Sequence, residues 1–227
     1  MSSALYGALI PAMNAVLIAT RNASKAAEFA QMLSDDLTLR WCDLSSVNIP
    51  TEEVEETGHT FRANACIKAS SYAQQTGLWT IADDSGLEVD ALDGSPGVVS
   101  ARWAELHARG KGDADNNQLL LAQLQNVSDE KRTARFVCVL ALADPKGRVI
   151  LTVRDCVDGR ITRTPRGANG FGYDPLFEVA GCDGKTTAEL PAEQKHAISH
   201  RGKALVRLKQ LLQHGVRATL FRMESDR

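Results

Sequence analysis

Short apolar segments alternate with helical segments along this chain, and this alternation limits the folds that it can adopt. Residues 14–20 (NAVLIAT) form an apolar run that predicts a buried strand, and residues 24–33 carry apolar side chains at the spacing of an amphipathic helix. A polar loop over residues 45–58 follows. Thr60 is then a plausible N-cap for a second amphipathic helix, and residues 78–82 predict a second buried strand.

The second half of the chain predicts one helix and one hairpin. A helix is expected to start near Asp113, because leucines recur on one of its faces. Residues 135–143 and 148–157 are extended runs joined by Asp144-Pro145-Lys146-Gly147, in which proline and glycine are typical of a tight turn. Strands that alternate with helices, together with one hairpin, predict an α/β fold with a mixed sheet.

A final helix is expected after Ser199 and should end before Gly215, since glycine often follows a helix C-terminus. We expect residues 1–13 to be a loose extension, residues 14–215 to be a single bilobal domain and residues 216–227 to be a tail. The side chains of the last helix expected to face inward are Ala204, Leu208, Leu211 and Leu212.

Charge and cysteine content argue against several functional classes. The chain has 26 Lys and Arg against 28 Asp and Glu, and a net charge of −2 disfavours a surface that wraps nucleic acid. Its five cysteines show no C-x-x-C pair, so we expect reduced thiols in a cytoplasmic protein rather than a zinc site. No run reaches the roughly 18 apolar residues of a membrane span, and we expect no membrane partner.

Thr20-Arg21-Asn22-Ala23-Ser24-Lys25 lies between the first expected strand and the first expected helix. The free N–H groups and positive dipole end of a helix N-terminus suit a phosphate group, and Lys25 would add a positive charge. The segment is not a Walker A loop, because G-x-x-x-x-G-K-[ST] does not occur in the chain. An ordinary capped turn with a solvated lysine is the alternative.

Two adjacent carboxylates follow the second buried strand, in what we expect to be a sharp polar turn, Asp83-Asp84-Ser85-Gly86. Open α/β sheets bind ligands at the carboxyl ends of strands. Adjacent side chains there point in different directions, so one carboxylate can hold a metal while the other orients a water. An acidic turn without function is equally compatible with the pattern. A second acidic group, more often a solvated loop, consists of Glu52, Glu53, Glu55 and Glu56.

Glycines alternate with aromatic residues in residues 167–177 (GANGFGYDPLF). Phe171, Tyr173 and Phe177 in such a segment suit a loop that stacks on a planar ring, and Asp174 offers an acceptor for a base-edge N–H. The alternative is an aromatic loop that packs onto its own domain.

Lys195 and the pair His200-Arg201 lie at the start of the last expected helix. Cations usually favour helix C-termini, so a His-Arg pair in a first turn indicates an electron-rich ligand. A lone histidine is more often structural, and Lys68 alone is typical of a solvated lysine. Taken together, the four segments supply a phosphate cradle, metal carboxylates, a ring-stacking loop and base-edge donors, which are the parts of a nucleotide site.

At these positions the sequence resembles the Ham1/RdgB family of inosine-triphosphate pyrophosphatases over nearly its whole length. The resemblance implies a magnesium-dependent homodimer with an elongated α/β fold and a cleft between two lobes. The implied reaction is hydrolysis of dITP, ITP, XTP or dXTP to the nucleoside monophosphate and pyrophosphate. Six segments carry it: TRNASK (20–25), EETGHTFRANACIKA (55–69), ADDSGLEVDAL (82–92), GSPGVVSARWA (94–104), GFGYDPLF (170–177) and KHAISHRGKAL (195–205).

The resemblance also implies roles for individual residues. Asp84 would be the general base and a magnesium ligand, with Asp83 supporting it and Ser85 near the substrate. Glu56 is the candidate for a second magnesium ligand, although Glu55 or Glu52 could serve instead. Phosphate contacts are implied for Thr20, Asn22, Lys25 and Lys68. Base contacts are implied for Phe171, which would stack on the ring, and for Gly172, Tyr173, Asp174, Lys195, His200 and Arg201.

Arg21 departs from the family pattern, which often has glycine there, so its side chain must point away from the phosphates or add a cationic contact. Selectivity is expected at C6 of the purine, where hypoxanthine and xanthine carry an acceptor oxygen and adenine carries a donor. Guanine shares that oxygen, and its exclusion stays open. Alternatives are a Maf-type pyrophosphatase acting on other nucleotides, a non-catalytic nucleotide-binding regulator and a nucleic-acid-binding module.

Overall fold

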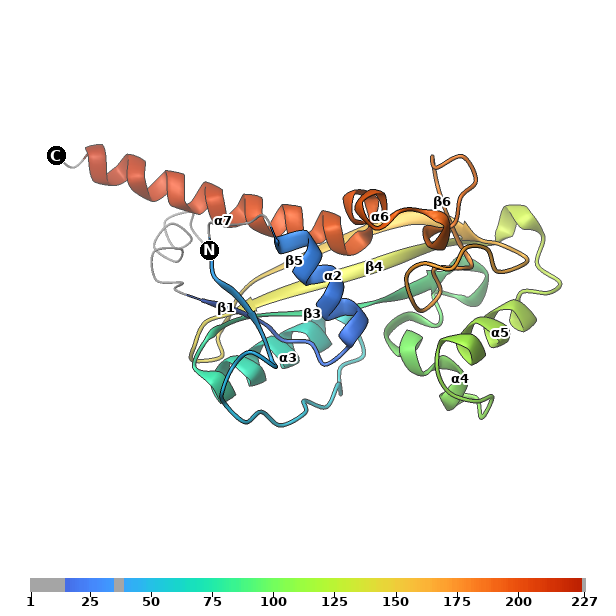
Figure 1. Ribbon diagram of the computed structural model, residues 1–227, viewed down its shortest axis with the longest axis horizontal. Coiled ribbons are helices and arrows are strands. Elements are labelled where there is room, and N and C mark those ends of the chain that lie inside the picture. Colours follow the sequence, from blue (N-terminus) through green and yellow to red (C-terminus); the bar gives the residue numbers. More distant parts are fainter. Residues whose placement is uncertain (1–14, 35–38, 226–227) are drawn as a thin grey trace.

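The protein is described here as a computed structural model that covers residues 15–34 and 39–225. The expected extension of residues 1–13 lies outside the described residues. One mixed six-stranded sheet forms the centre of the molecule, in the strand order β2-β1-β3-β4-β5-β6 (Figure 1). The predicted α/β fold with a mixed sheet is confirmed. The strands are β1 (Val16–Ile18), β2 (Trp41–Asp43), β3 (Trp79–Val89), β4 (Thr133–Ala143), β5 (Val149–Ile161) and β6 (Phe177–Val179).

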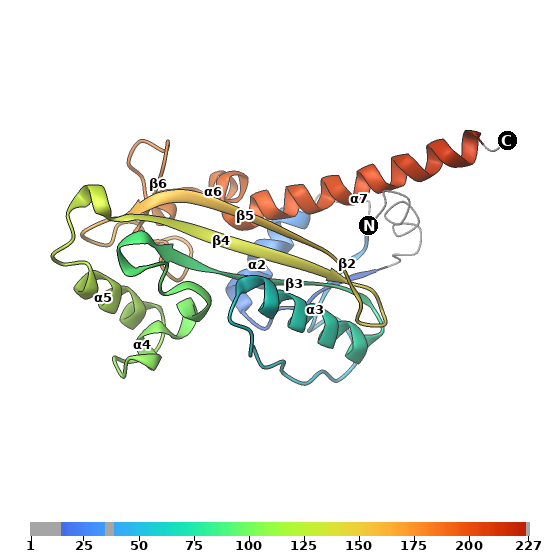
Figure 2. The same ribbon diagram turned by 180° about the vertical axis from the view of Figure 1, so that it is seen from behind.

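Helices cover both faces of this sheet. α2 and α7 pack on one face and α3 packs on the other. α4 and α5 lie near one end of the long strands, and α3 lies near the opposite end (Figure 2). The α-helices are α2 (Ala23–Leu33), α3 (Phe61–Thr76), α4 (Trp103–Leu106), α5 (Asp113–Gln123), α6 (Ala192–Ile198) and α7 (His200–Ser225). Short 3₁₀ helices are η2 (Asp90–Leu92), η3 (Gly97–Arg102), η4 (Asp129–Lys131) and η5 (Thr187–Glu189). None of the described helices is both long and apolar enough to cross a membrane.

Local sequence signals set the helix starts. The Asn22 side chain accepts a hydrogen bond from the backbone of Lys25 at 3.0 Å and begins α2. Thr60 accepts one from Ala63 at 3.1 Å and begins α3. α3 ends at Gly77, whose φ of 67° is left-handed and suits glycine. Both predicted helices and the predicted N-cap are therefore confirmed.

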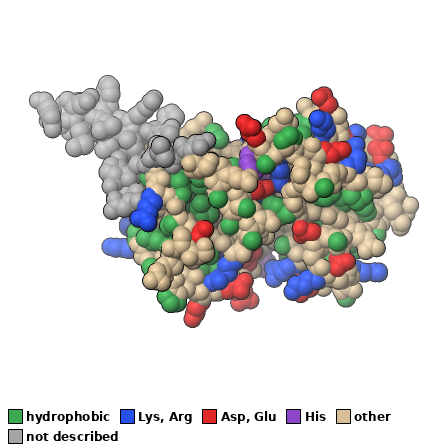
Figure 3. Space-filling view, in the orientation of Figure 1, with side chains coloured by type: hydrophobic (Ala, Val, Ile, Leu, Met, Phe, Trp, Pro, Cys, Tyr) green, Lys and Arg blue, Asp and Glu red, His purple; other side chains and the backbone are tan. Residues whose placement is uncertain are grey.

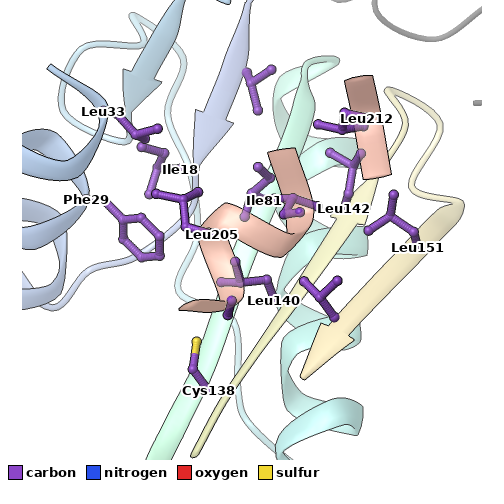
Figure 4. Packing of buried hydrophobic residues seen from close by; sticks show 14 of the residues in the cluster. Ile18, Phe29, Leu33, Ile81, Cys138, Leu140, Leu142, Leu151, Leu205 and Leu212 are labelled. Carbon is purple, nitrogen blue, oxygen red and sulfur yellow. The ribbon is translucent and has the colours of Figure 1, made fainter. Parts of the chain in front are cut away.

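The hairpin is also confirmed, because β4 and β5 pair antiparallel and the backbone N–H of Gly147 donates to Asp144 at 2.8 Å. On one face of the sheet, Ile81 and Leu140 meet Leu205 and Leu212 of α7 beside Phe29 of α2 (Figure 4). This packing between elements from both ends of the chain fixes α2 and α7 side by side over the sheet.

The predicted end of the last helix is wrong. α7 continues through Gly215 to Ser225, because glycine weakens a helix without ending it unless the backbone turns left-handed. Residues 216–225 of the expected tail are therefore helical. Ala204, Leu208 and Leu212 are buried as expected, but Leu211 is 43% exposed, since it lies beyond the edge of the face that packs on the sheet.

The expected polar turn at Asp83 and Asp84 is also wrong. β3 is continuous from Trp79 to Val89 and pairs with β4 along nearly its whole length. β1 accompanies only the first three residues of β3, so from Ala82 onward that edge of β3 has no β1 neighbour. Gly86 serves close approach rather than a turn, because a Cβ atom there would lie 2.5 Å from the Gly97 carbonyl oxygen.

Candidate active site

A cavity of about 620 Å³ opens where β1 ends and β3 continues, a volume in the range typical of small-ligand sites. It is lined by residues from all four segments singled out in the sequence, although Thr20 and Arg201 are 181 positions apart in the chain. On the face shown in Figure 3, charged side chains of both signs are interspersed, without a continuous basic surface. The cavity is therefore the place where the predicted nucleotide-binding parts meet.

The loop before α2 forms the first wall. Asn22 caps the helix, and its own backbone N–H donates to the Thr20 hydroxyl at 3.2 Å. Lys25 extends from the first turn of α2 and its Nζ lies 3.0 Å from Oδ2 of Asp83. Arg21 is turned toward Tyr72 and Thr51, with Nε 3.0 Å from the Tyr72 hydroxyl and Nη2 2.6 Å from the Thr51 carbonyl. Thr20, Asn22 and Lys25 thus shape a loop at a helix N-terminus, as predicted.

Asp84 projects from β3 toward α3. Its Oδ2 accepts a hydrogen bond from the Asn64 amide at 3.1 Å, and its Oδ1 lies 3.5 Å from Nζ of Lys68. Burial raises the pKa of Asp84 to about 6, and Glu56 and Asp83 act in the same direction, whereas Lys68 and Lys25 oppose them. A carboxylate with such a pKa is suited to accept a proton near neutral pH.

Glu56 meets the same lysine, with its Oε1 2.5 Å from Nζ of Lys68. Glu55 and Glu56 line the cavity and Glu52 does not, so Glu52 is not placed at the site. Among the described residues, no group of three or more His, Cys, Asp or Glu side chains converges as a metal cage. A site of two carboxylates, Asp84 and Glu56, is what the geometry offers.

Asp83 points to the other face of β3, because successive side chains of a strand alternate. It does not line the cavity. Its Oδ2 accepts a hydrogen bond from the Ser85 hydroxyl at 3.0 Å and lies 3.6 Å from Nη2 of Arg201. Burial alone would raise the pKa of Asp83, but Lys25 and Arg201 outweigh burial and hold that pKa well below its ordinary value. Asp83 is therefore a permanent anion beneath the cavity.

The aromatic loop forms the opposite wall. Phe171 lines the cavity, with Nζ of Lys195 5.1 Å and Cζ of Arg201 5.8 Å from its ring centroid. Asp174 holds the loop, because its Oδ2 accepts from the Phe171 backbone at 2.8 Å and from Lys195 at 2.6 Å. Tyr173 is buried and its hydroxyl donates to the Ser100 carbonyl at 2.9 Å.

Phe177 is not part of this wall. It begins β6 and is fully buried in the core around Phe136, with the two ring centroids 4.5 Å apart. The expectation that it belongs to a stacking loop is wrong, because the aromatic pattern continues from the loop into a core strand.

The neighbouring helix α5 holds the loop through two hydrogen bonds to the backbone of Gly172. Oδ2 of Asp113 accepts from the Gly172 N–H at 2.7 Å, and the Asn117 amide donates to the Gly172 carbonyl at 2.9 Å. Gly172 has a φ of 62°, a conformation that favours glycine. No sequence signal pointed to these contacts, because Asn117 and Asp113 lie 55 and 59 positions from Gly172 in the chain.

His200 differs from the cationic role implied by its pairing with Arg201. It is buried and stacks on Phe136, with ring centroids 4.9 Å apart and an interplanar angle of 15°. Burial, together with the charges of Arg201 and Lys195, lowers its pKa well below the ordinary value, so His200 is neutral. Of the His200-Arg201 pair, Arg201 is therefore the member that carries positive charge into the cavity.

Glu28 is a further residue of the site that the sequence analysis did not identify. It lies on α2, is buried, and accepts hydrogen bonds from Lys195 at 2.6 Å and from Arg201. Burial would raise its pKa, but Arg201 and Lys195 outweigh burial and lower it. A buried Lys and a buried Arg require a counter-ion, so two cations assigned to one pocket were the signal that a carboxylate must lie beside them.

Comparisons with known proteins agree with this geometry. The model of the Ham1 family matches residues 16–211. A protein of Bacillus licheniformis named dITP/XTP pyrophosphatase is 49% identical over 202 residues, which cover 88% of this chain and 98% of that protein. A Bacillus subtilis protein of the same name is 45% identical over 203 residues, with coverage of 88% and 98%.

Solved structures show the same architecture. The structure of a HAM1 protein from Coxiella burnetii matches with a TM-score of 0.77 at 42% identity, covering 88% of this chain and 99% of that chain. A nucleoside-triphosphatase / dITP/XTP pyrophosphatase from Mycobacterium abscessus matches with a TM-score of 0.66 at 47% identity, covering 86% and 98%. On the family match, the relatives and the shared fold, this chain belongs to the Ham1 family.

Proposed function

We propose that this protein hydrolyses aberrant purine nucleoside triphosphates (dITP, ITP, XTP and dXTP) to the nucleoside monophosphate and pyrophosphate. The observation that carries the proposal is that one cavity holds Lys25 at a helix N-terminus, the carboxylates Asp84 and Glu56, and Phe171 beside Arg201. The two relatives named above carry the name dITP/XTP pyrophosphatase, which supports the same substrate class here.

Asp84 acts as the general base in this proposal. It orients the attacking water and accepts its proton, while the Asn64 amide holds one carboxylate oxygen in place at 3.1 Å. The water attacks the α-phosphorus, the α–β phosphoanhydride breaks, and pyrophosphate leaves. Lys25 and Lys68 stabilise the charge that develops on the leaving pyrophosphate.

The carboxylates fit a magnesium ion that is shared with the substrate. Mg²⁺ is commonly bound by one or two carboxylates together with substrate phosphates and waters, rather than by a cage of protein ligands. Asp84 and Glu56 both line the cavity, and Lys68 already brings a positive charge between them. Asp84 and Glu56 would hold the ion. When bound, Mg²⁺ neutralises charge on the phosphate oxygens.

Phe171 and the nearby cations Lys195 and Arg201 recognise the base. Phe171 stacks on the purine ring, with Gly172, Tyr173 and Asp174 completing that wall. Arg201 and Lys195 present N–H donors that pair with the C6 oxygen of hypoxanthine or xanthine. Adenine would place an amino donor against buried donors, which costs up to the order of 10⁴-fold in discrimination. Neutral His200 contributes a ring nitrogen to the same edge.

Two further properties are inferred from the family resemblance. The protein works as a homodimer, and it acts in the cytoplasm, where aberrant nucleotides arise in the precursor pool. Size-exclusion chromatography with light scattering tests the first, and a mass of one chain in solution would refute it.

Substrate and product analysis tests the function. With Mg²⁺ present, we expect dITP and XTP to be hydrolysed with a kcat/KM at least about 100-fold above that for dATP, and we expect EDTA to abolish turnover. The direct products should be monophosphate and pyrophosphate. Release of a diphosphate and orthophosphate would refute attack at the α-phosphorus. Preference for dTTP or UTP would favour a Maf-type enzyme, and binding without turnover would indicate a regulator.

A further inference from the structure

A continuous chain of polar contacts runs from Arg201 through Ser85 and Asp83 to Lys25, and of these residues Asp83 alone does not line the cavity. At the base end, Nη2 of Arg201 donates to Oγ of Ser85 at 3.0 Å. The Ser85 hydroxyl donates to Oδ2 of Asp83, also at 3.0 Å. At the phosphate end, Nζ of Lys25 lies 3.0 Å from the same oxygen. A single carboxylate oxygen therefore connects the cation that reads the base with the cation that meets the phosphates.

Asp83 and a bound triphosphate compete for the ammonium group of Lys25. The Asp83 side chain is 1% exposed, so water does not weaken its hold on Lys25. Two other groups weaken the attraction between Asp83 and Lys25. The Ser85 hydroxyl donates to Oδ2 of Asp83, and Nη2 of Arg201 lies 3.6 Å from the same oxygen. Each of these donors lowers the negative charge that Lys25 meets. Loss of either donor strengthens the Lys25–Asp83 pair at the expense of the phosphates.

The network has room to rearrange. Oδ1 of Asp83 and Nε of Arg201 are both buried and have no hydrogen-bond partner among the described residues. Such atoms are costly to leave unpaired, and Arg201 is anchored on its other side by Glu28. A guanidinium held at one end and incompletely paired at the other can change its contact with Ser85 when a ligand arrives.

We propose that Ser85 is a positioning residue that transmits the identity of the base from Arg201, through Asp83, to Lys25. The inference rests on the proposed function, which places the base at Arg201 and the phosphates at Lys25. A C6 oxygen accepts from Arg201 and leaves the guanidinium beside Ser85. A C6 amino group repels Arg201 from this position, Asp83 then holds Lys25 more tightly, and the leaving pyrophosphate loses a stabilising cation. An adenine nucleotide should therefore have a lower kcat as well as a higher KM.

Steady-state kinetics with ITP and ATP test the coupling. Ser85→Ala should lower kcat for ITP by about tenfold, whereas kcat for ATP, whose base has already broken the contact, should change by less than about twofold. Ser85→Cys keeps the volume but donates weakly and should behave like Ser85→Ala. Ser85→Thr retains the hydroxyl and should restore most of the ITP rate. Ser71→Ala, on α3 and outside the cavity lining, is the matched control.

A binding measurement tests the same coupling without turnover. Inosine should raise the affinity of the wild-type protein for inorganic pyrophosphate by about tenfold in the presence of Mg²⁺, and adenosine should not. Because coupling is reciprocal, pyrophosphate should raise the affinity for inosine by the same factor. Ser85→Ala should abolish both effects. Isothermal titration calorimetry measures each pair of affinities.

Two results would overturn the proposal. One is an equal loss of kcat for ITP and ATP in a folded Ser85→Ala protein, which is what a purely structural serine produces. The other is an inosine effect on pyrophosphate affinity that survives in Ser85→Ala. A wild-type protein that hydrolyses neither ITP nor XTP would instead refute the proposed function, and the binding measurement would still decide whether the two ends of the cavity are coupled.

Discussion

Glu28 and Arg201 form a buried ion pair although 173 positions separate them in the chain. The pair joins the second turn of α2 to the first turn of α7, two helices that lie on the same face of the sheet. Glu28 also accepts from Lys195, which has Asp174 as a second partner, while Arg201 lies beside Asp83, so carboxylates accompany both buried cations at the base end of the cavity. The cavity can therefore present two positive donors to a ligand without leaving their charges uncompensated.

Glu28→Gln is expected to destabilise the protein by about 3 kcal/mol, because Lys195 and Arg201 lose the carboxylate they share and keep only Asp174 and Asp83 as counter-ions. The melting temperature should fall by roughly 10 °C. Thermal unfolding by circular dichroism measures the change, with Glu193→Gln on the exposed surface of α6 as control. Equal melting temperatures for the two variants would show that Glu28 is dispensable for the charge balance.

Asp84→Asn is expected to lower kcat for dITP by roughly 10²–10⁴, the usual effect of losing a general base. The amide keeps the shape of the carboxylate but has neither its charge nor its basicity. Binding of a non-hydrolysable analogue should persist, because Phe171 and Arg201 are unchanged. If a folded Asp84→Asn protein keeps more than about a tenth of the wild-type kcat, the base lies elsewhere, and Glu56 is the next candidate.

The pH profile of kcat/KM should show an acid limb near pH 6. Asp84 acts as a base only when ionised, and burial raises its pKa to about 6, so activity falls as the pH drops through that value. Asp83 does not contribute to this limb, since its lowered pKa keeps it ionised. Initial rates between pH 4.5 and 8.5 measure the limb, and full activity at pH 5 would contradict the assignment.

Asn117→Ala is expected to raise KM for ITP by about fivefold with little effect on kcat, because Gly172 loses one of the two hydrogen bonds that hold the loop of Phe171. The neighbouring Gln118 is exposed on the same helix, so Gln118→Ala is the matched control. An unchanged KM would mean that Asp113 alone holds Gly172 in place.

Arg132→Met is expected to destabilise the protein by about 3 kcal/mol or more without a specific effect on selectivity. The buried guanidinium donates to three backbone carbonyls, those of Ile161 at 2.7 Å, Leu124 at 2.6 Å and Thr162 at 2.9 Å. Methionine leaves these acceptors unpaired. Denaturant unfolding measures the loss. Arg163→Met, which removes an exposed ion pair with Asp129, should cost no more than about 1 kcal/mol.

The sequence by itself determined the local elements and the composition of the site. Caps such as Asn22 and Thr60, helical spacing and the turn at Gly147 act within a few residues, so they can be read directly from the chain. The segments that line the cavity were likewise recognisable from their residue types. Each of these signals depends on neighbours in the sequence.

Only the tertiary structure decided how the polar side chains pair. Asp83 and Asp84 were expected in a polar turn after a buried strand. β3 carries both instead, since Lys25 and Arg201 compensate one and Asn64 and Lys68 bind the other. Such partners come from α2, α3 and α7, far from β3 in the chain, and no local periodicity reports them. A buried charge is stable only beside its partner, so its position in the sequence becomes intelligible only when the fold has brought the partner to it.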